Sequence, residues 1–257
     1  MTARPTSRTE SPADSLASYR RNVYSQNGED GVIAEILRRL RITSGTFCEF
    51  GAWDGRYGSN SYSLLLGGWR GLMIEGDPTR YRALLRTARS FGTRLRTVNA
   101  WIDSTPGASS LDSHLQRAEM PREFELLSID VDGIDYWIWQ SLVSFQPLIV
   151  VIEIDSSAEP GIEHVHDEKR TMTTFSPMLK LGKSKGYELV CHTGNMIFVR
   201  RDRIQELRLP EVELEHPASL FDPSWVNPTS WSTWRRKLRN LTWQRALVKV
   251  INALRRA

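Results

Sequence analysis

Acidic side chains recur where apolar runs of this sequence end. Glu75, Asp130 with Asp132, and Glu153 each close or follow such a run. In an open α/β sheet the carboxyl ends of parallel strands meet at one edge, where ligands bind, so we expect these carboxylates to line one cleft. Carboxylates in a cleft can take a proton from a substrate or hold a hard cation such as Mg²⁺. Asp130 and Asp132 are therefore candidate catalytic bases, and together with Glu153 they are a candidate metal site.

The segment CEFGAWDG combines glycines and acids at the end of another apolar run. Gly51 allows a tight turn, and Gly55 lets the backbone come close to a bound ligand. Glu75, at the end of the next run, is placed to accept hydrogen bonds from ribose hydroxyls. A pyrophosphate loop needs a glycine where this chain has Trp53, and Asp54 would repel a diphosphate.

The same loop therefore favours S-adenosylmethionine (SAM), a cation without phosphate, as the cofactor. NAD, and with it an NAD-dependent oxidoreductase, is disfavoured. The alternative is an ordinary turn whose acids face water.

A second group of candidate residues lies in the loop after the apolar run 148–154. His164 and His166 are candidate catalytic residues there, because imidazole titrates near neutral pH. An H-x-H pair can also bind a metal, but the sequence fixes no third ligand beside it. The alternative is a solvated loop.

Apolar patterns along the chain predict strands and helices in alternation. This order indicates a doubly wound, mostly parallel sheet with helices on both faces. The last two strands are close enough to form a hairpin, which implies one antiparallel strand at the edge. The expected strands are 46–51, 71–75, 95–99, 125–130, 148–154, 187–191 and 196–200, and the main expected helices are 29–41, 78–90, 136–144 and 176–185.

The 257 residues suffice for one α/β domain with short extensions. Hydrophobic residues at 40% and charged residues at 25% are ordinary values for a globular protein. No apolar run reaches the roughly 18 residues of a membrane span, and the polar N-terminus lacks the apolar core of a secretory signal. These features predict a cytoplasmic protein, in which Cys48 and Cys191 would be free thiols.

Four segments are expected along the chain: a disordered leader over 1–18, the main domain over 19–205, a linker over 206–230, and a basic amphipathic helix over 231–257. The last segment contains eight Lys or Arg and no Asp or Glu. Its Trp and Leu residues suit an anionic membrane surface, which would make the protein peripheral on the inner face of the plasma membrane. Packing on the domain and a homodimer contact are the alternatives. The rest of the chain is mildly acidic, so no nucleic-acid partner is expected.

Several of these segments, in this order, resemble the FkbM-type SAM-dependent methyltransferases, particularly a branch that acts on polysaccharides and glycolipids. The resemblance covers about residues 25–200, roughly two-thirds of the chain. It implies a Rossmann-like class I methyltransferase fold with a seven-stranded sheet, SAM as methyl donor and, most often, transfer to oxygen. The matching segments are SQNGEDG, EFGAWDG followed by Ser59 and Asn60, GWRGLMIEGDP, LSIDVDGIDYWIW and VVIEID.

The resemblance also assigns roles by position. The loop after the first strand would line the methionine end of SAM, the acid after the second strand would hold the ribose, and the residues after the third strand would lie near the adenine. Trp101 would stack on the adenine or, alternatively, be a core aromatic. The segment before the first helix would fold over the cofactor or, alternatively, cap that helix. The cofactor-binding candidates are Gln26, Glu29, Glu49, Gly51, Ala52, Asp54, Gly55, Asn60, Glu75, Asn99, Ala100, Trp101 and Asp130.

One family segment departs from its pattern, which is near IDxEGxE. This chain has the shorter aspartate at both glutamate positions, Asp132 and Asp135. We expect Asp135 to cap the helix that follows it. The leading expectation is O-methylation of a sugar hydroxyl on a glycolipid or polysaccharide, with transfer to nitrogen or carboxylate open. The alternative from another class is a non-catalytic SAM-fold adaptor recruited to the membrane by its basic tail.

Overall fold

The computed structural model describes residues 14–167 and 172–226. Within these residues a seven-stranded sheet has the order β3-β2-β1-β4-β5-β7-β6. Apolar side chains fill both faces of the central strands, which is typical of a parallel sheet covered by helices on each side. The strands are β1 (Thr46–Phe50), β2 (Arg70–Glu75), β3 (Leu95–Asn99), β4 (Leu126–Ile129), β5 (Ile149–Glu153), β6 (Tyr187–His192) and β7 (Asn195–Arg200).

Strands β3, β2, β1, β4 and β5 pair in parallel, and β7 runs antiparallel to both β5 and β6. The expected Rossmann-like sheet, with one antiparallel strand at that end, is therefore confirmed. The antiparallel strand lies one position in from the edge, because the hairpin folds back between β5 and β6.

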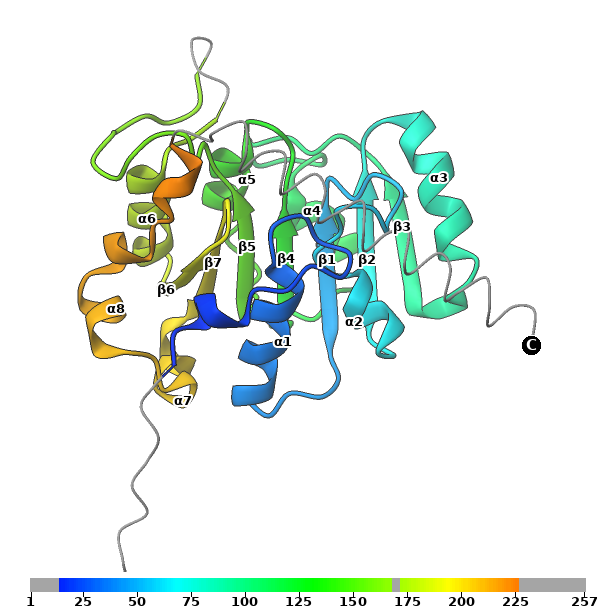
Figure 1. The fold of residues 1–257 in the computed structure, drawn as a ribbon. Helices are drawn as coiled ribbons and strands as arrows, with labels where there is room; N and C mark the ends of the chain where they lie inside the picture. The colour runs from blue at the N-terminus through cyan, green and yellow to red at the C-terminus, as the bar shows by residue number, and fades with distance from the viewer. Residues whose placement is uncertain (1–13, 168–171, 227–257) are drawn as a thin grey trace, which may run out of the picture.

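Helices cover both faces of the sheet (Figure 1). Neighbouring strand residues point to opposite faces, so Val150 and Ile152 join one core while Ile149 and Val151 join the other. One core is closed by α1 (Glu29–Arg39), α2 (Tyr62–Leu66), α3 (Pro78–Ala88) and α7 (Ile204–Leu207), and the other by α4 (Leu111–Arg117), α5 (Asp135–Ser141) and α6 (Phe175–Ser184).

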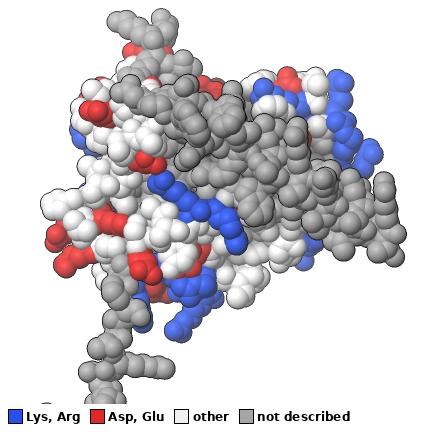
Figure 2. Space-filling model, viewed as in Figure 1, with Lys and Arg blue, Asp and Glu red and all other residues white. Residues whose placement is uncertain are grey.

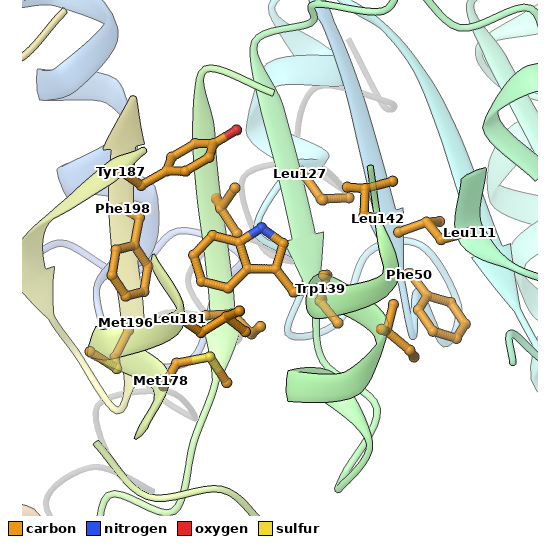
Figure 3. Packing of buried hydrophobic residues seen from close by; sticks show 14 of the residues in the cluster. Phe50, Leu111, Leu127, Trp139, Leu142, Met178, Leu181, Tyr187, Met196 and Phe198 are labelled. Atoms are coloured by element: carbon orange, nitrogen blue, oxygen red, sulfur yellow. The ribbon is translucent and has the colours of Figure 1, made fainter. Parts of the chain in front are cut away.

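Trp139 fixes α5 against the sheet (Figure 3). Its side chain is fully buried, and its ring centroid lies 5.0 Å from that of Phe198 on β7 and 5.6 Å from that of Tyr187 on β6. Burying an indole of this size stabilises the fold by several kcal/mol, about 3 to 5 by the cost of removing one. The turn that precedes α5 is thereby held close to the ends of β4 and β5.

The described part of the predicted linker differs from its expectation. Residues 206–226 include the end of α7, α8 (Glu211–Glu215) and two short 3₁₀ turns. They pack on the domain because the segment carries apolar side chains that become buried, among them Leu207 at 0% exposure. Arg20 pairs with Asp222 at 2.8 Å and fastens the segment to the N-terminal part of the chain.

The end of the predicted disordered leader, residues 14–18, also packs on the domain, because Leu16 is fully buried in the core that α1 closes. Residues 1–13 and the predicted basic helix over 231–257 lie outside the described residues. Among the helices that the structure describes, none combines the length and apolar character that crossing a membrane would require.

Candidate functional site

Gly51 joins the turn after β1 to the turn after β4. Its φ is +81°, and a Cβ built on it would lie 1.8 Å from the carbonyl oxygen of Asp130. No side chain fits in that space, so glycine is required here by contact with the neighbouring turn as well as by conformation. The two turns are therefore held together at the carboxyl edge of the sheet.

Gly55 is required by the packing of the core beneath the loop. Its φ is +73°, and a Cβ there would lie 2.5 Å from Cδ1 of Leu84 and 3.0 Å from the sulfur of Met73. The missing side chain faces the core between β2 and α3. The absence of a side chain at Gly55 is thus required by the protein's own core, and the approach of its backbone to a ligand stays a prediction.

Glu49 organises the segment that follows the loop. It is buried at the end of β1, and its carboxylate accepts hydrogen bonds from the hydroxyls of Ser59 (2.6 Å) and Ser61 and from the backbone N–H of Asn60 (3.0 Å). Burial raises the pKa of Glu49, and these donors oppose that rise. The Asn60 side chain in turn donates to the hydroxyl of Ser128 on β4 at 3.0 Å.

The carboxylate of Glu75, at the end of β2, binds backbone N–H groups of two neighbouring turns. One carboxylate oxygen accepts from the N–H of Trp53 and the other from the N–H of Asp77, each at 2.8 Å. Trp53 has a left-handed backbone with a φ of 49°, so its indole points outward and is 47% exposed. The guanidinium of Arg80 lies 4.7 Å from the centre of that ring.

Asp54 and Ala52 take local positions in the same loop. The Asp54 carboxylate accepts from the N–H groups of Arg56 (2.9 Å) and Tyr57 (2.7 Å), which closes a tight turn. Ala52 is buried. The hydrogen bonds of Asp54 lie within residues 54–57 and do not involve the acids after β4 and β5.

The predicted adenine side of the site lies after β3. The Asn99 amide donates to the carbonyl oxygens of Glu75 (2.7 Å) and Gly76 (3.0 Å), and the Ala100 N–H donates to Glu75 at 3.2 Å. Trp101 is 73% exposed and its ring lies against Gly76. The alternative of a core aromatic at Trp101 is wrong, because the side chain lies on the surface.

The segment before α1 is tied to the far side of the sheet. Glu29 is fully buried and accepts from the N–H of Asn27 (2.8 Å), the hydroxyl of Thr193 (2.7 Å) and the amide of Asn195 (3.3 Å). Burial raises its pKa. The residue therefore joins the start of α1 to the β6–β7 hairpin, while Gln26 is exposed beside the turn at residue 58.

The acids after β4 and β5 form a cluster. Ile129 pairs with Ile152 across the two strands, so the next residues, Asp130 and Glu153, lie side by side. One carboxylate oxygen from each of Asp130, Asp132 and Glu153 can be chosen so that all lie within 4.8 Å of one another. The cluster brings together the three residues that the sequence predicts as a metal site.

Burial dominates the electrostatics of this cluster. It raises the pKa of Asp130 to about 7, with a further contribution from the charges of Asp135 and Asp132. Burial and the adjacent Asp130 raise the pKa of Glu153 to about 9. Glu153 is thus the protonated member of the pair at neutral pH, and its Oε2 is buried without a hydrogen-bond partner among the described residues.

Asp135 does not cap α5, contrary to expectation. It is the first residue of the helix, and its carboxylate accepts from the N–H groups of Val131 (3.0 Å) and Gly133 (2.9 Å). These bonds close the turn over residues 130–133, in which Asp132 has a φ of 57°. Asp135 therefore positions the exposed Asp132 and the start of the cluster.

The two histidines are placed by the loop after β5. Both backbones are fastened to threonines before α6, with His164 N–H donating to Thr174 (3.2 Å) and His166 N–H to Thr173 (3.0 Å). His164 Nε2 lies 3.7 Å from a carboxylate oxygen of Asp167. In the part of the chain that the structure describes, the group of possible metal ligands includes neither histidine.

Sequence reasoning missed the residues that hold the acids. Ser61, Ser128 and Thr193 are all buried and hydrogen-bonded within this edge. His192 is also buried there: its Nε2 lies 2.8 Å from the Ser156 hydroxyl, and its Nδ1 accepts from a backbone N–H at 3.0 Å. Because these partners come from distant segments, local patterns give no signal for them.

Comparison with known proteins concerns the fold. No protein-family model matches the sequence, and no curated protein matches it. Similar solved structures include an S-adenosylmethionine-dependent methyltransferase from Clostridium acetobutylicum ATCC 824, with 10% identity over 70% of this chain and 93% of that chain and a TM-score of 0.43. Another is an O-methyltransferase family protein from Burkholderia thailandensis, with 12% identity over 66% of this chain and 55% of that chain and a TM-score of 0.44.

A third is TrmK of M. capricolum in complex with S-adenosyl-homocysteine, with 11% identity over 70% of this chain and 73% of that chain and a TM-score of 0.41. The chain thus spans little more than half of the Burkholderia protein. At such identities the likeness is one of overall fold.

Proposed function

We propose that this protein is a SAM-dependent methyltransferase that methylates a sugar hydroxyl of a glycolipid or polysaccharide. The observation that carries the proposal is the partly buried pair of Asp130 and Glu153 beside the Gly51 turn, at the carboxyl edge of the sheet. This edge is where open α/β sheets bind their ligands. The resemblance to the FkbM-type methyltransferases supports both the cofactor and the class of acceptor.

The residues at this edge fit SAM. When bound, SAM supplies a methyl group on a cationic sulfonium, and a cation is favoured by an edge rich in carboxylates. Each oxygen of Glu75 already accepts one backbone N–H and has a second lone pair for a ribose hydroxyl. The exposed ring of Trp101 offers a flat apolar surface at the adenine side.

Asp130 is the residue best suited to remove the proton of the acceptor. A base works best with a pKa near the working pH, and burial raises the pKa of Asp130 to about 7. Glu153, protonated at that pH, can donate to Asp130 and hold it in place. Asp132 is exposed next to the pair and is a second candidate base.

A divalent cation is a second use of the same oxygens. Asp130, Asp132 and Glu153 would hold it, because three hard oxygen ligands lie close together and Glu153 Oε2 has no other described partner. Mg²⁺ there would lower the pKa of a bound acceptor hydroxyl. Binding would displace the proton from Glu153, so metal and proton compete for the site.

Calorimetric titration with SAM tests the cofactor, and release of S-adenosylhomocysteine with candidate glycans tests the reaction. We expect SAM binding in the micromolar range, with turnover that D130N abolishes and E119Q, at an exposed side chain, leaves intact. No binding at millimolar SAM would overturn the proposal. Binding to vesicles with SAM bound but never consumed, across a panel of glycans, would favour the adaptor.

The partners and location follow as parts of this proposal. A lipid-linked acceptor would place the protein in the cytoplasm on the inner face of the plasma membrane, with the basic segment 231–257 at the bilayer. Co-sedimentation of the full chain with anionic vesicles, and its mass by ultracentrifugation, test the membrane and homodimer expectations in turn.

A further inference from the structure

The exposed face of α3 is a stripe of arginines. Arg82, Arg86 and Arg89 are spaced by four and three residues, so they lie on one side of the helix, and all three are exposed. Leu84, on the opposite side, is fully buried against the sheet. The helix itself, Pro78–Ala88, contains no Asp or Glu.

None of these arginines forms an ion pair in the part of the chain that the structure describes, although the pKa of Asp77, lowered first by backbone hydrogen bonds, is lowered further by the charge of Arg82. In that part of the chain, every carboxylate oxygen lies more than 4.0 Å from the three guanidinium groups, which is too far for an ion pair. Some other surface arginines form ion pairs, as Arg203 does with Glu206 and Arg201 with Glu188. The positive charge on α3 is therefore not neutralised by an ion pair among the described residues.

Helix α8, near the other end of the sheet, is acidic. It contributes Glu211, Glu213 and Glu215 without a basic residue, and it packs beside β6. Blue side chains gather on the side of the molecule where α3 lies, and red ones on the side where α8 lies (Figure 2).

We infer that the arginine face of α3 is the surface by which this protein meets an anionic lipid bilayer. Leu85 is 38% exposed between the arginines, and an apolar residue framed by arginines is typical of helices that lie at a lipid interface. The three glutamates of α8 are repelled by the same surface, which disfavours approach by that helix. The basic segment 231–257 adds charge of the same sign.

Two other partners fit the charge less well. A nucleic acid would gain nothing from the exposed Leu85, and the chain outside its last segment is mildly acidic. A second copy could set its α8 against α3, and such head-to-tail contacts would build rings or open chains. The experiment separates both from the bilayer.

The test uses the full chain and vesicles of phosphatidylglycerol with phosphatidylcholine, compared with phosphatidylcholine alone. The variant is R82Q/R86Q/R89Q. The matched control is R41Q/R70Q/R122Q, which removes the same charge. Arg41 lies in the loop before β1, Arg70 is the first residue of β2, and Arg122 lies in the loop before β4. Arg80 stays unchanged in both, because its guanidinium lies over Trp53 in the proposed cofactor loop.

We expect the α3 variant to bind anionic vesicles at least tenfold more weakly than the control, since each basic residue near an anionic bilayer contributes about fivefold in affinity. The difference should vanish on neutral vesicles and shrink with added salt. Equal binding by the two variants would overturn the inference. So would a loss confined to binding of a short RNA, or a salt-sensitive fall in sedimentation coefficient without lipid.

SAM affinity measured on the same samples reports folding and the proposed function separately. Both variants should bind SAM as the unaltered chain does, since none of the substituted residues touches the proposed site. If the α3 variant loses vesicle binding and still binds SAM, the result supports the inference about α3 and shows that the variant is folded. Retained vesicle binding with no SAM binding in any sample would overturn the proposed function and leave the α3 face as inferred.

Discussion

The carboxyl edge of the sheet has two halves that use the same chemical group in opposite ways. On the β1–β2 half, the carboxylate oxygens of Glu49 and Glu75 accept hydrogen bonds from hydroxyls and backbone N–H groups of nearby loops. On the β4–β5 half, Asp130 and Glu153 face each other, and one oxygen of Glu153 is buried without a described partner.

This difference separates holding from reacting. A carboxylate surrounded by donors is fixed in place and shapes the loop around it, whereas two carboxyl groups pressed together in a buried site share protons near neutral pH. The first arrangement presents a preformed surface to a cofactor. The second leaves a carboxyl group, Asp130, whose pKa lies near neutral pH, which is what a proton transfer needs.

The largest expected effect comes from the residue that joins the two halves. G51A places a Cβ on the Asp130 carbonyl oxygen and strains a left-handed backbone, so we expect a loss of about 4 kcal/mol in the free energy of unfolding, or failure to fold. Urea denaturation measures it. G107A is the control, because a Cβ at Gly107 meets nothing within 4 Å. Equal stability of the two variants would mean that the halves are not held together at Gly51.

The next effect distinguishes the two members of the reacting pair. D130N should lower the turnover number at least 100-fold, because the base is lost, with the dissociation constant of SAM changed by less than about threefold. E153Q keeps a donor to Asp130 and should retain activity within about tenfold. Stopped-time assays of S-adenosylhomocysteine release measure both. If E153Q is as inactive as D130N and the unaltered chain needs added Mg²⁺, the pair holds a metal instead.

A smaller effect is expected on the holding half. E49Q puts an amide N–H₂ where three donors converge, so it should cost about 2 kcal/mol of stability and weaken SAM binding through the displaced segment 59–61. Thermal unfolding and calorimetry measure the two changes. E119Q, at a side chain that is 83% exposed, should change neither. A stable E49Q with normal SAM affinity would remove Glu49 from its positioning role.

The pH dependence has a definite sign for the reacting pair. Both folded-state pKa values, about 7 for Asp130 and about 9 for Glu153, lie above the unfolded values near 4. The folded chain therefore binds more protons across this window, so the pair's contribution to stability falls as pH rises from about 4 to 9. E153Q should flatten the fall, while the turnover number should rise through about pH 7. Denaturation midpoints at pH 5 and 9 measure the first.

The smallest effect is expected at the edge of the cofactor surface. W101A removes an exposed ring, so we expect stability to stay within about 0.5 kcal/mol. SAM affinity should fall by about three- to tenfold if the ring stacks on the adenine, which calorimetry resolves. V143A, at a residue that is 76% exposed away from this edge, is the control. An unchanged affinity would take Trp101 out of the cofactor surface.

Local features of the sequence determined the elements and their alternation. The predicted strand 95–99 is the observed one, and the predicted strand 46–51 differs from β1 by one residue. Runs of apolar residues and turn-forming glycines act between neighbours along the chain, so they are visible without the fold. The same patterns placed Asp130, Asp132 and Glu153 at strand ends, and therefore at one edge.

The failures have a shared cause. Residues 206–226 look like a polar linker, yet they pack because their few apolar side chains meet the domain's surface. Asp135 looks like a helix cap, yet its carboxylate serves the turn behind it. In both cases the sequence shows the chemical group, and only the tertiary contacts show its partner.

The sequence by itself thus determined where the strands lie along the chain and which acids stand at their ends. What only the tertiary structure decided is which acid is satisfied and which is left to react. Thr193 reaches Glu29 across 164 residues of sequence, and Glu153 meets Asp130 only because β4 and β5 pair in one register. The free energy of a buried carboxylate depends on donors brought from distant segments, and those distances exist only after folding.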